Sequence, residues 1–157
     1  MSTEDLAVPV FGEPHIGATI RPSAYGIIAG SGGRIAVVRT PLGWFLPGGG
    51  SDETESPEAT VTRETLEECG LAIRVGAWRR SAIEHSFSVT EQTYFEKHST
   101  FCDAVLIQPA GAPSEPDHAL VWMAVRDART FLSPPGHRWA VDEWLASAVP
   151  ADIDPAT

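Results

Sequence analysis

Three glutamates stand close together near the middle of this 157-residue chain. Glu67 and Glu68 follow Glu64 by three and four positions, and in an α-helix, which turns about 100° per residue, such positions lie within an arc of roughly 100° on one face. Like charges at this spacing destabilise a helix by roughly a few tenths of a kcal/mol. A cation held among the carboxylates would relieve that repulsion, so the triplet is a candidate metal site.

Carboxylate oxygens are hard ligands, and they favour hard divalent cations such as Mg²⁺ or Mn²⁺. Mg²⁺ in particular is often held by one or two carboxylates, while substrate phosphates occupy other positions around the ion. The alternative for any acidic triplet is a solvated helix face without a ligand. Spacing over a longer stretch of sequence decides between these interpretations.

The glutamates belong to a pattern that runs from Gly49 to Leu71. Five residues separate Gly49 from Glu55, and seven more separate Glu55 from the stretch RETLEECGL at residues 63–71. This arrangement resembles the signature of the Nudix hydrolase family, the MutT-like proteins, which reads G-x5-E-x7-R-E-U-x-E-E-x-G-U with U a bulky aliphatic residue. All seven fixed letters of that signature are present. The one departure is Thr65, which stands at the first U position and is expected to affect packing rather than metal binding.

The resemblance extends over roughly residues 20–148 and implies both a fold and an activity. The fold class would be α/β, a Nudix-type α/β/α sandwich with a mixed β-sheet. The activity would be Mg²⁺-dependent hydrolysis of a diphosphate (pyrophosphate) linkage in a nucleoside diphosphate joined to another moiety, such as a nucleoside triphosphate or a nucleotide sugar. Mn²⁺ is the alternative cofactor.

Carried over position by position, the resemblance implies roles for individual residues. Glu64, Glu67 and Glu68 would be the catalytic residues and metal ligands, with Glu64 as a ligand or general base, and the backbone carbonyl of Gly48 would be a further ligand. Arg63 would pair with Glu55, and a planar guanidinium that holds a carboxylate at two points could fix the loop against the helix. That pair would support the site structurally.

A further carboxylate outside the signature could take part in catalysis. Glu115 is the preferred candidate, because the loop before the strand expected at 119–125 is roughly where some members of the family that the signature resembles place an extra catalytic carboxylate. Asp117 lies in the same loop. Glu84 and Glu96 are interpreted as outward-facing strand residues, and no single basic residue or histidine is assigned to the substrate.

A helix over residues 57–69 would position the carboxylates. Ser56 suits the N-cap, Pro57 the first turn, and Gly70 the left-handed position that ends a helix. The preceding Pro47 and residues 48–50, all glycine, predict a loop whose backbone can approach a ligand closely.

On the side of this helix away from the carboxylates, four residues fall within roughly 80° and form a narrow, mostly apolar stripe. They are Ala59, Thr62, Leu66 and Cys69. The helix is therefore expected to pack on a sheet through this stripe, with its carboxylates turned outward.

Apolar runs rich in β-branched residues, bounded by turn residues, predict strands around this helix. The strands are expected at Ser23–Ala29, Arg34–Thr40, Ala72–Phe87, Thr93–Ile107 and Ala119–Val125. The first two and the next two are each expected to pair as a hairpin. Two helices, at about 126–131 and 136–148, are expected to follow. The chain would thus consist of an N-terminal tail or edge segment (1–20), a Nudix hydrolase domain (21–148) and a C-terminal tail (149–157).

The charge balance limits the classes of partner. With 21 acidic against 11 basic residues, the net charge is −10, which repels polyanions and lacks the basic footprint of a nucleic-acid binder. No stretch approaches a membrane span and residues 1–20 do not resemble a leader, so we expect a cytoplasmic protein. Cys69 and Cys102 are expected to be free and buried. The expected partner is a small nucleotide-type molecule, and a homodimer is left open.

A non-catalytic Nudix module that binds a nucleotide or an ADP-ribose-like ligand as a regulator is the second hypothesis. Against it, the signature retains every carboxylate, whereas regulatory modules commonly lose some of them. The signature does not name the substrate, because specificity in this family lies in loops and strands outside it.

Overall fold

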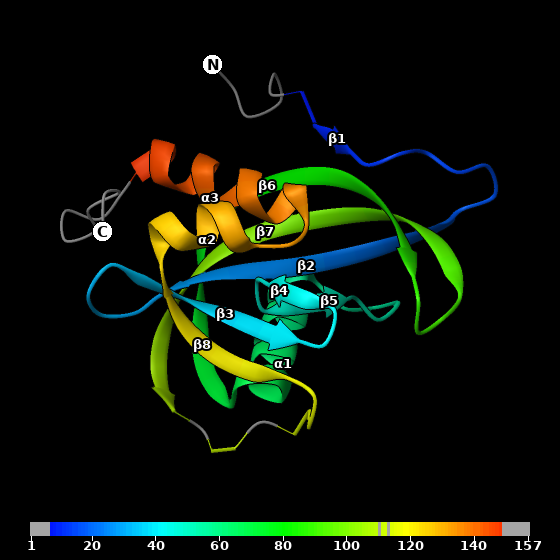
Figure 1. Cartoon of the computed structure of the whole chain (residues 1–157). Coiled ribbons are helices and arrows are strands. Elements are labelled where there is room, and N and C mark those ends of the chain that lie inside the picture. The colour runs from blue at the N-terminus through cyan, green and yellow to red at the C-terminus, as the bar shows by residue number, and fades with distance from the viewer. Residues whose placement is uncertain (1–6, 110, 113, 149–157) are drawn as a thin grey trace.

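The computed structural model describes residues 7–109, 111–112 and 114–148 (Figure 1). The elements are β1 (Val10–Phe11), β2 (Thr19–Ala29), β3 (Arg34–Thr40), β4 (Gly43–Phe45), β5 (Gly48–Gly50), α1 (Pro57–Cys69), β6 (Leu71–Ser88), β7 (Thr93–Pro109), β8 (Ala119–Ala124), α2 (Val125–Phe131) and α3 (Pro135–Ala148). Residues 1–6 of the expected N-terminal tail and the expected C-terminal tail at 149–157 lie outside the described residues.

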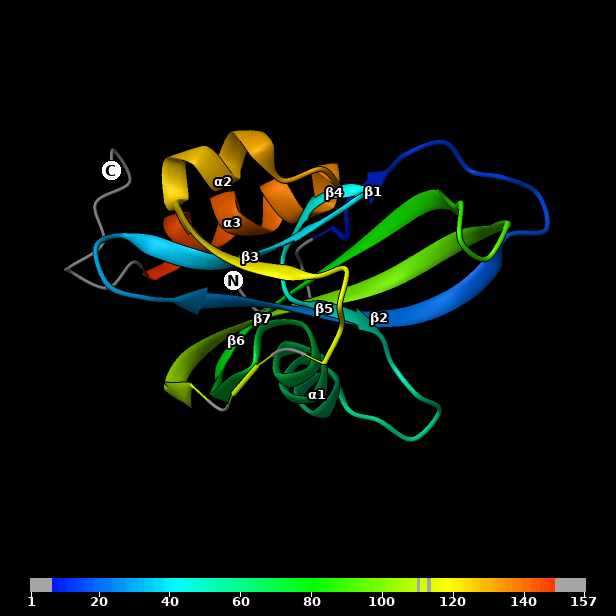
Figure 2. The same ribbon diagram turned by 60° about the horizontal axis from the view of Figure 1, so that its bottom comes forward.

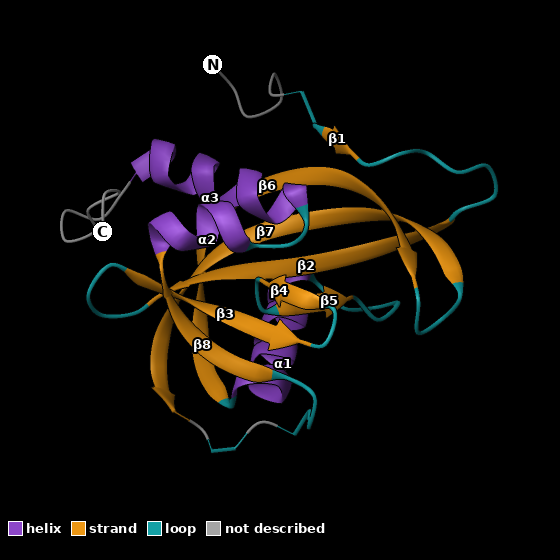
Figure 3. Ribbon diagram, viewed as in Figure 1, coloured by secondary structure: helices purple, strands orange, loops and turns teal. Residues whose placement is uncertain are grey.

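The strands form one mixed sheet in the order β1-β6-β7-β2-β3-β4, with β5 paired to β2 and β8 paired to β3 (Figure 3). The β2–β7 and β1–β6 pairs are parallel, and the remaining pairs are antiparallel. All five predicted strands are present within a few residues of their expected bounds. The long β6–β7 hairpin confirms the pairing expected for those two strands.

Helices cover both faces of the sheet. Figure 2 shows α1 on one face and α2 with α3 on the other, which confirms the predicted α/β/α sandwich. The central strand β2 serves both layers, because successive side chains of a strand point to opposite faces. Ala24 and Ile28 belong to the core under α1, whereas Tyr25 and Ile27 belong to the core under α2 and α3.

The ends of α1 are those predicted from the sequence. The Ser56 side chain accepts a hydrogen bond from the backbone N–H of Ala59, and Gly70 adopts the left-handed conformation with φ of 67°. Its N–H donates to the carbonyl oxygen of Leu66, which closes the last turn. Local capping signals therefore placed this helix correctly.

The face of α1 that packs on the sheet differs from the prediction. Ala59, Thr62 and Leu66 are exposed, and only Cys69 of the expected stripe is buried. The buried residues of α1 are instead Thr60, Val61, Thr65, Glu68 and Cys69. The reason is that Val61 packs onto β2 at Gly26, where the absence of a side chain lets the helix approach closely. The helix is therefore rotated about its axis relative to the prediction, and Glu68 points inward. The expectation that all three carboxylates point outward was wrong.

Thr65 is completely buried, and its hydroxyl oxygen has no hydrogen-bond partner in the described part of the chain. A buried polar group without a partner costs about 1–3 kcal/mol. Thr65→Val keeps the shape of the side chain and removes the hydroxyl, so we expect the free energy of unfolding to rise by about 1–2 kcal/mol. Urea denaturation measures this change. Thr62→Val, at an exposed position of the same helix, is the matched control, and an equal gain there would contradict the explanation.

His137 belongs to the first turn of α3 and is buried, and its Nδ1 accepts a hydrogen bond from the backbone N–H of Leu46 at 3.1 Å. Burial, and then the positive charges of Lys97 and Arg138, lower its pKa from 6.5 to about 3. In the unfolded chain the His137 imidazole is protonated below about pH 6.5, whereas in the folded chain it stays neutral down to about pH 3. Stability is therefore lost as the pH falls through this window.

We expect His137 to contribute up to about 1.4 kcal/mol of lost stability per pH unit between about pH 6 and pH 3. His137→Asn should flatten this dependence, since the Asn oxygen can accept the same backbone N–H without titrating. Denaturant unfolding of both proteins at several pH values measures the slopes. Equal slopes would contradict this role of His137.

Two further features of the fold bear on the sequence predictions. Cys69 and Cys102 are free and buried, as expected. None of the helices in the described ranges has the length and apolar character that crossing a membrane requires.

Candidate active site

The glycine segment that leads into α1 lies directly beside the helix. Residues 48–50 were expected to form a loop, but they form the short strand β5, which pairs with β2 through the register Tyr25 to Gly48. Gly48 has φ of 150°, and a Cβ there would lie 2.1 Å from the carbonyl oxygen of Ala24. Only glycine permits so close an approach. The pairing brings the backbone of Gly48 against the carboxylate of Glu68.

Glu68 is the most buried of the three carboxylates, with 7% of its surface exposed. Its Oε1 accepts the backbone N–H of Gly48 at 2.9 Å, and its Oε2 lies 3.3 Å from Nε2 of His118. Burial raises the pKa of Glu68 to about 8 despite the Gly48 hydrogen bond, and the neighbouring charges of Glu64, Glu115 and Glu67 raise it further. The protein therefore keeps a carboxylate where an uncompensated negative charge is unfavourable.

Arg63 connects the carboxylates to the preceding loop. Its Nη1 lies 3.0 Å from Oε1 of Glu64 and 3.3 Å from Oε2 of Glu67, so the two carboxylates approach one nitrogen. Its Nε and Nη2 donate to the two oxygens of Glu55 at 2.7 and 2.9 Å. Nη2 also donates to the carbonyl oxygen of Gly50 at 3.2 Å.

The two-point contact with Arg63 has an electrostatic consequence for Glu55. The hydrogen bonds from Arg63, followed by that from the backbone N–H of Asp52, lower the pKa of Glu55 to about 2. Thr60 donates a further hydrogen bond from its hydroxyl to Oε1 at 2.9 Å. Glu55 is thus held as a carboxylate that fixes Arg63 and the loop against α1.

The carboxylates have the right chemistry for a hard divalent cation, but they are engaged with protein donors. Among the described residues, no three His, Cys, Asp or Glu side chains already converge as a preformed metal site. Arg63 contacts Glu64 and Glu67, while Gly48 contacts Glu68. One guanidinium nitrogen lies within hydrogen-bond distance of both Glu64 and Glu67, so these two carboxylates already share one positive partner. The donor set fits a divalent cation.

A pocket of about 460 Å³ opens next to Glu68 and Gly48. This is the size range of small-ligand sites in proteins. Its walls combine apolar side chains with a few polar groups, and they include Tyr25, Thr40, Pro41, Leu42, Phe45, Leu46, Thr90, Asp117 and His118. The pocket therefore brings a cavity for an organic group into contact with the acidic end of α1.

The loop before β8 closes the other side of the carboxylates. The backbone N–H groups of Ser114 and Glu115 donate to the carbonyl oxygen of Glu67 at 2.9 and 3.2 Å. The charge of Glu115 raises the pKa of both Glu64 and Glu68, so its carboxylate lies within electrostatic reach of them. Glu115 is thus brought beside the signature residues, and Asp117 reaches the pocket wall.

Sequence reasoning missed two residues of this site. No histidine was assigned to the site, but His118 lies beside Glu68. Its one sequence signal was its position in the loop that contains Glu115 and Asp117. Tyr25 lies at the pocket wall, and burial and then the charges of Glu84 and Glu68 raise its pKa. Nothing in the sequence distinguished Tyr25 from a core residue.

The other two candidate carboxylates have different positions. Glu84 is buried, with 6% of its surface exposed, so its interpretation as an outward-facing residue was wrong. Glu84 is buried because the start of α3 covers it, and the backbone N–H of Gly136 donates to its Oε2 at 3.0 Å. Glu96 is partly exposed and pairs with His98 at 2.6 Å.

Comparisons with known proteins support the resemblance given by the signature. A family model described as NUDIX domain matches residues 19–146. A Mycobacterium tuberculosis protein named "Putative 8-oxo-dGTP diphosphatase 3" is 28% identical over 93 residues, which are 59% of this chain and 42% of that protein. The chain thus spans less than half the length of this curated relative.

Solved structures share the fold. A MutT protein from Methanosarcina mazei Go1 matches with a TM-score of 0.61 and 19% identity over 83% of this chain and 96% of that one. An Ap4A hydrolase from C. elegans matches with a TM-score of 0.61 and 16% identity over 82% of this chain and 98% of that one. Together with the family match over residues 19–146, the geometry around α1 leads to one conclusion: the chain belongs to the Nudix family.

Proposed function

We propose that this chain is a divalent-cation-dependent hydrolase that cleaves a diphosphate linkage in a nucleoside diphosphate joined to another moiety. The observation that carries the proposal is the position of Glu68, a carboxylate of the Nudix signature, which together with Gly48, the residue just before the signature, lines a pocket of about 460 Å³. The names of the similar proteins, an 8-oxo-dGTP diphosphatase and an Ap4A hydrolase, support the same class of substrate.

Glu67, Glu68 and the backbone carbonyl of Gly48 would hold the cation, with Glu64 as a ligand or general base. We propose that the cation is Mg²⁺, with Mn²⁺ as the alternative. When bound, such an ion supplies neutralisation of phosphate charge and Lewis acidity at the reacting phosphorus. The buried position of Glu68 favours this role, since a bound cation compensates a charge that burial otherwise makes costly.

Glu64 is the proposed general base. Its pKa is raised mainly by burial, which outweighs the lowering by Arg63, and a raised pKa makes a carboxylate a better proton acceptor near neutral pH. Glu64 would take a proton from the water that attacks phosphorus, while the bond from phosphorus to the bridging oxygen breaks. Glu115 is the proposed additional carboxylate.

Arg63 and Glu55 are proposed as positioning residues. Their two-point contact and the hydrogen bond from Arg63 to the carbonyl oxygen of Gly50 join the loop after β5 to the helix that carries the carboxylates. Holding these groups in one geometry lowers the entropic part of the barrier.

The setting of the enzyme is proposed on two observations. The net charge of −10 favours a small nucleotide-type substrate over a nucleic-acid polymer. Two free, buried cysteines fit a reducing compartment such as the cytoplasm. We assign the Nudix hydrolase domain to residues 21–148.

A turnover screen tests the proposed function. The panel contains ordinary and oxidised nucleoside triphosphates, nucleotide sugars, ADP-ribose and dinucleoside polyphosphates, each with Mg²⁺, with Mn²⁺ and with a chelator, and chromatography identifies the products. We expect metal-dependent cleavage at a diphosphate linkage in at least one class. Tight binding of one compound without turnover of any would instead favour a regulatory binding module.

A further inference from the structure

A second pocket, of about 440 Å³, has Tyr25 and Glu84 in its wall and none of the signature carboxylates. It shares Tyr25, Leu42 and Phe45 with the pocket beside Glu68, so the two cavities have a common wall. Burial, and then the charges of Glu84 and Glu68, raise the pKa of Tyr25, so both carboxylates lie within electrostatic reach of its hydroxyl. A ligand that passes Tyr25 could therefore reach both pockets.

Glu84 is the buried charged group of this second pocket. Its Oε2 accepts the backbone N–H of Gly136 at 3.0 Å, which orients the carboxylate. Within the described part of the chain, this is the only hydrogen bond to the Glu84 side chain. Oε1 therefore has no partner there, and it is not fully enclosed by the protein. Oε1 is therefore available to a ligand in the pocket, and the orientation of the carboxylate is already determined.

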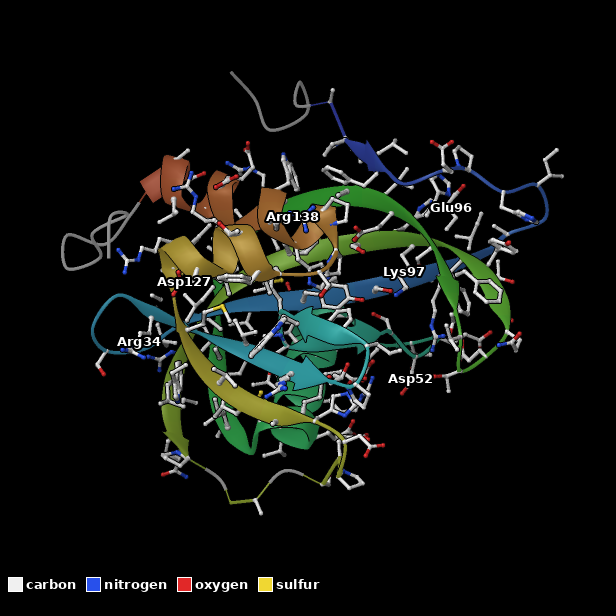
Figure 4. All side chains as sticks on the ribbon, viewed as in Figure 1. Arg34, Asp52, Glu96, Lys97, Asp127 and Arg138 are labelled. Atoms are coloured by element: carbon white, nitrogen blue, oxygen red, sulfur yellow. The ribbon has the colours of Figure 1, made fainter. Side chains whose placement is uncertain are left out.

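Lys97 supplies the complementary charge. It is the direct cross-strand partner of Glu84 in the β6–β7 hairpin, so both side chains extend from the same face of the sheet. Both residues line the pocket. Burial raises the pKa of Glu84 and lowers the pKa of Lys97, and the charge of each group acts against the shift of the other. Figure 4 shows Lys97 over the central strands and Glu96, its neighbour in sequence, nearer the edge of the molecule. The pocket thus presents an acceptor and a donor side by side.

The remaining walls suit a flat aromatic ring. Phe45 and Phe87 provide aromatic surfaces, Leu42 and Val89 provide aliphatic ones, and Tyr25 forms the boundary with the first pocket. Ligand sites of this size commonly consist of apolar walls with a few convergent polar groups that determine orientation. A planar base with a polar edge matches this arrangement.

We propose that the pocket of Glu84 and Lys97 is a base subsite that selects guanine. The Watson–Crick edge of guanine carries two adjacent donors, N1–H and the 2-amino group, next to the acceptor O6. Each carboxylate oxygen can accept two hydrogen bonds, so Oε1 can accept one of these donors and the second lone pair of Oε2 the other, beside the Gly136 N–H. The lysine ammonium can donate to O6. The assignment deepens the proposed function and rests on it, since it names the nucleotide whose diphosphate would reach the carboxylates of α1.

The other bases match the pair less well. Adenine presents one amino group and a ring nitrogen acceptor on this edge, so only one donor faces the carboxylate. Inosine keeps N1–H and O6 but lacks the 2-amino group, which makes it a sharp probe. A pair of hydrogen bonds to one base commonly gives a discrimination of about 10-fold or more.

The first experiment measures kcat/KM of the whole chain for GTP, ITP and ATP with Mg²⁺. We expect ITP to be poorer than GTP by about 10-fold and ATP to be poorer still. Glu84→Gln, which can still accept the Gly136 N–H, should reduce the preference for GTP over ITP to less than about 3-fold, because the amide accepts one donor rather than two. Glu96→Gln is the matched control: it makes the same change on the opposite face of β7 and should keep the preference.

The second experiment measures equilibrium binding of GMP, IMP and AMP by calorimetry in the presence of a chelator, so that hydrolysis plays no part. Preferential GMP binding that Glu84→Gln removes would support the subsite even if no nucleotide were hydrolysed, which would contradict only the proposed function. Turnover and binding that are equal for the three bases would overturn the subsite and leave the proposed function intact. If Glu84→Gln fails to fold, the wild-type preferences and Lys97→Met, which removes the donor to O6, provide the same test.

Discussion

Replacing Glu68 with Gln is expected to lower kcat by roughly 10³-fold, which is equivalent to about 4 kcal/mol. A loss of this size lies within the several kcal/mol that the Lewis acidity of a bound metal contributes to catalysis. Glu68 lies at the junction of α1, β5 and the pocket, where its loss removes one of the proposed ligands. The fold should survive, since the Gln oxygen can still accept the Gly48 N–H. Glu67→Gln, at a less buried position, should also reduce activity strongly.

The measurements combine steady-state kinetics on the substrate found in the screen with thermal unfolding with and without Mg²⁺. Mg²⁺ should raise the unfolding temperature of the wild-type chain, because a ligand that binds only the folded state stabilises it. This shift should be lost in Glu68→Gln. Glu58→Gln, on the first turn of the same helix, is the matched control and should retain both turnover and the Mg²⁺ shift. Full turnover in Glu68→Gln would overturn the assignment of Glu68 as a ligand.

Gly48→Ala should destabilise the chain by about 3–5 kcal/mol, because it combines an unfavourable backbone conformation with overpacking, each of which costs about 1–3 kcal/mol. The added Cβ would lie 2.1 Å from the carbonyl oxygen of Ala24 and 2.6 Å from the Cα of Tyr25, and neither backbone atom can move without breaking the β2–β5 pairing. The proposed ligand carbonyl would move with the strand. Activity and stability should therefore fall together.

Gly32→Ala separates the two causes. Gly32 also has a positive φ, of 68°, but a Cβ there would meet nothing within 4 Å. Only the backbone penalty applies, so we expect a loss of about 1–2 kcal/mol and unchanged turnover. Denaturant unfolding of the three proteins measures both effects. If the two variants lost equal stability, close packing at Gly48 would not explain the requirement for glycine.

Signals that depend on neighbours in the chain predicted the elements well. Ser56 and Gly70 define both ends of α1 because an N-cap hydroxyl and a left-handed glycine act within one turn of helix. The glycines and the apolar runs likewise predicted the β2–β3 and β6–β7 pairs of strands. These features follow from local conformational preferences, which tertiary contacts did not overrule.

Features that depend on distant contacts were predicted less well. Residues 48–50 form a strand because β2 offers a partner, and Glu84 is buried because the start of α3 covers it. His118 reaches Glu68 across 50 residues of sequence. No local pattern marks these contacts, since the partner of each group belongs to another element of the sandwich.

The sequence by itself determined that a helix at 57–69 carries Glu64, Glu67 and Glu68 at the spacing i, i+3 and i+4. It also determined that a glycine segment precedes this helix and that Arg63 can pair with Glu55. The tertiary structure decided how that helix is rotated on the sheet, and thus that Glu68 points inward while Leu66 is exposed. It also decided which segments meet at the two pockets. The reason is physical: helical periodicity determines the angles between side chains on one helix, whereas packing against β2 determines which side chains face the sheet.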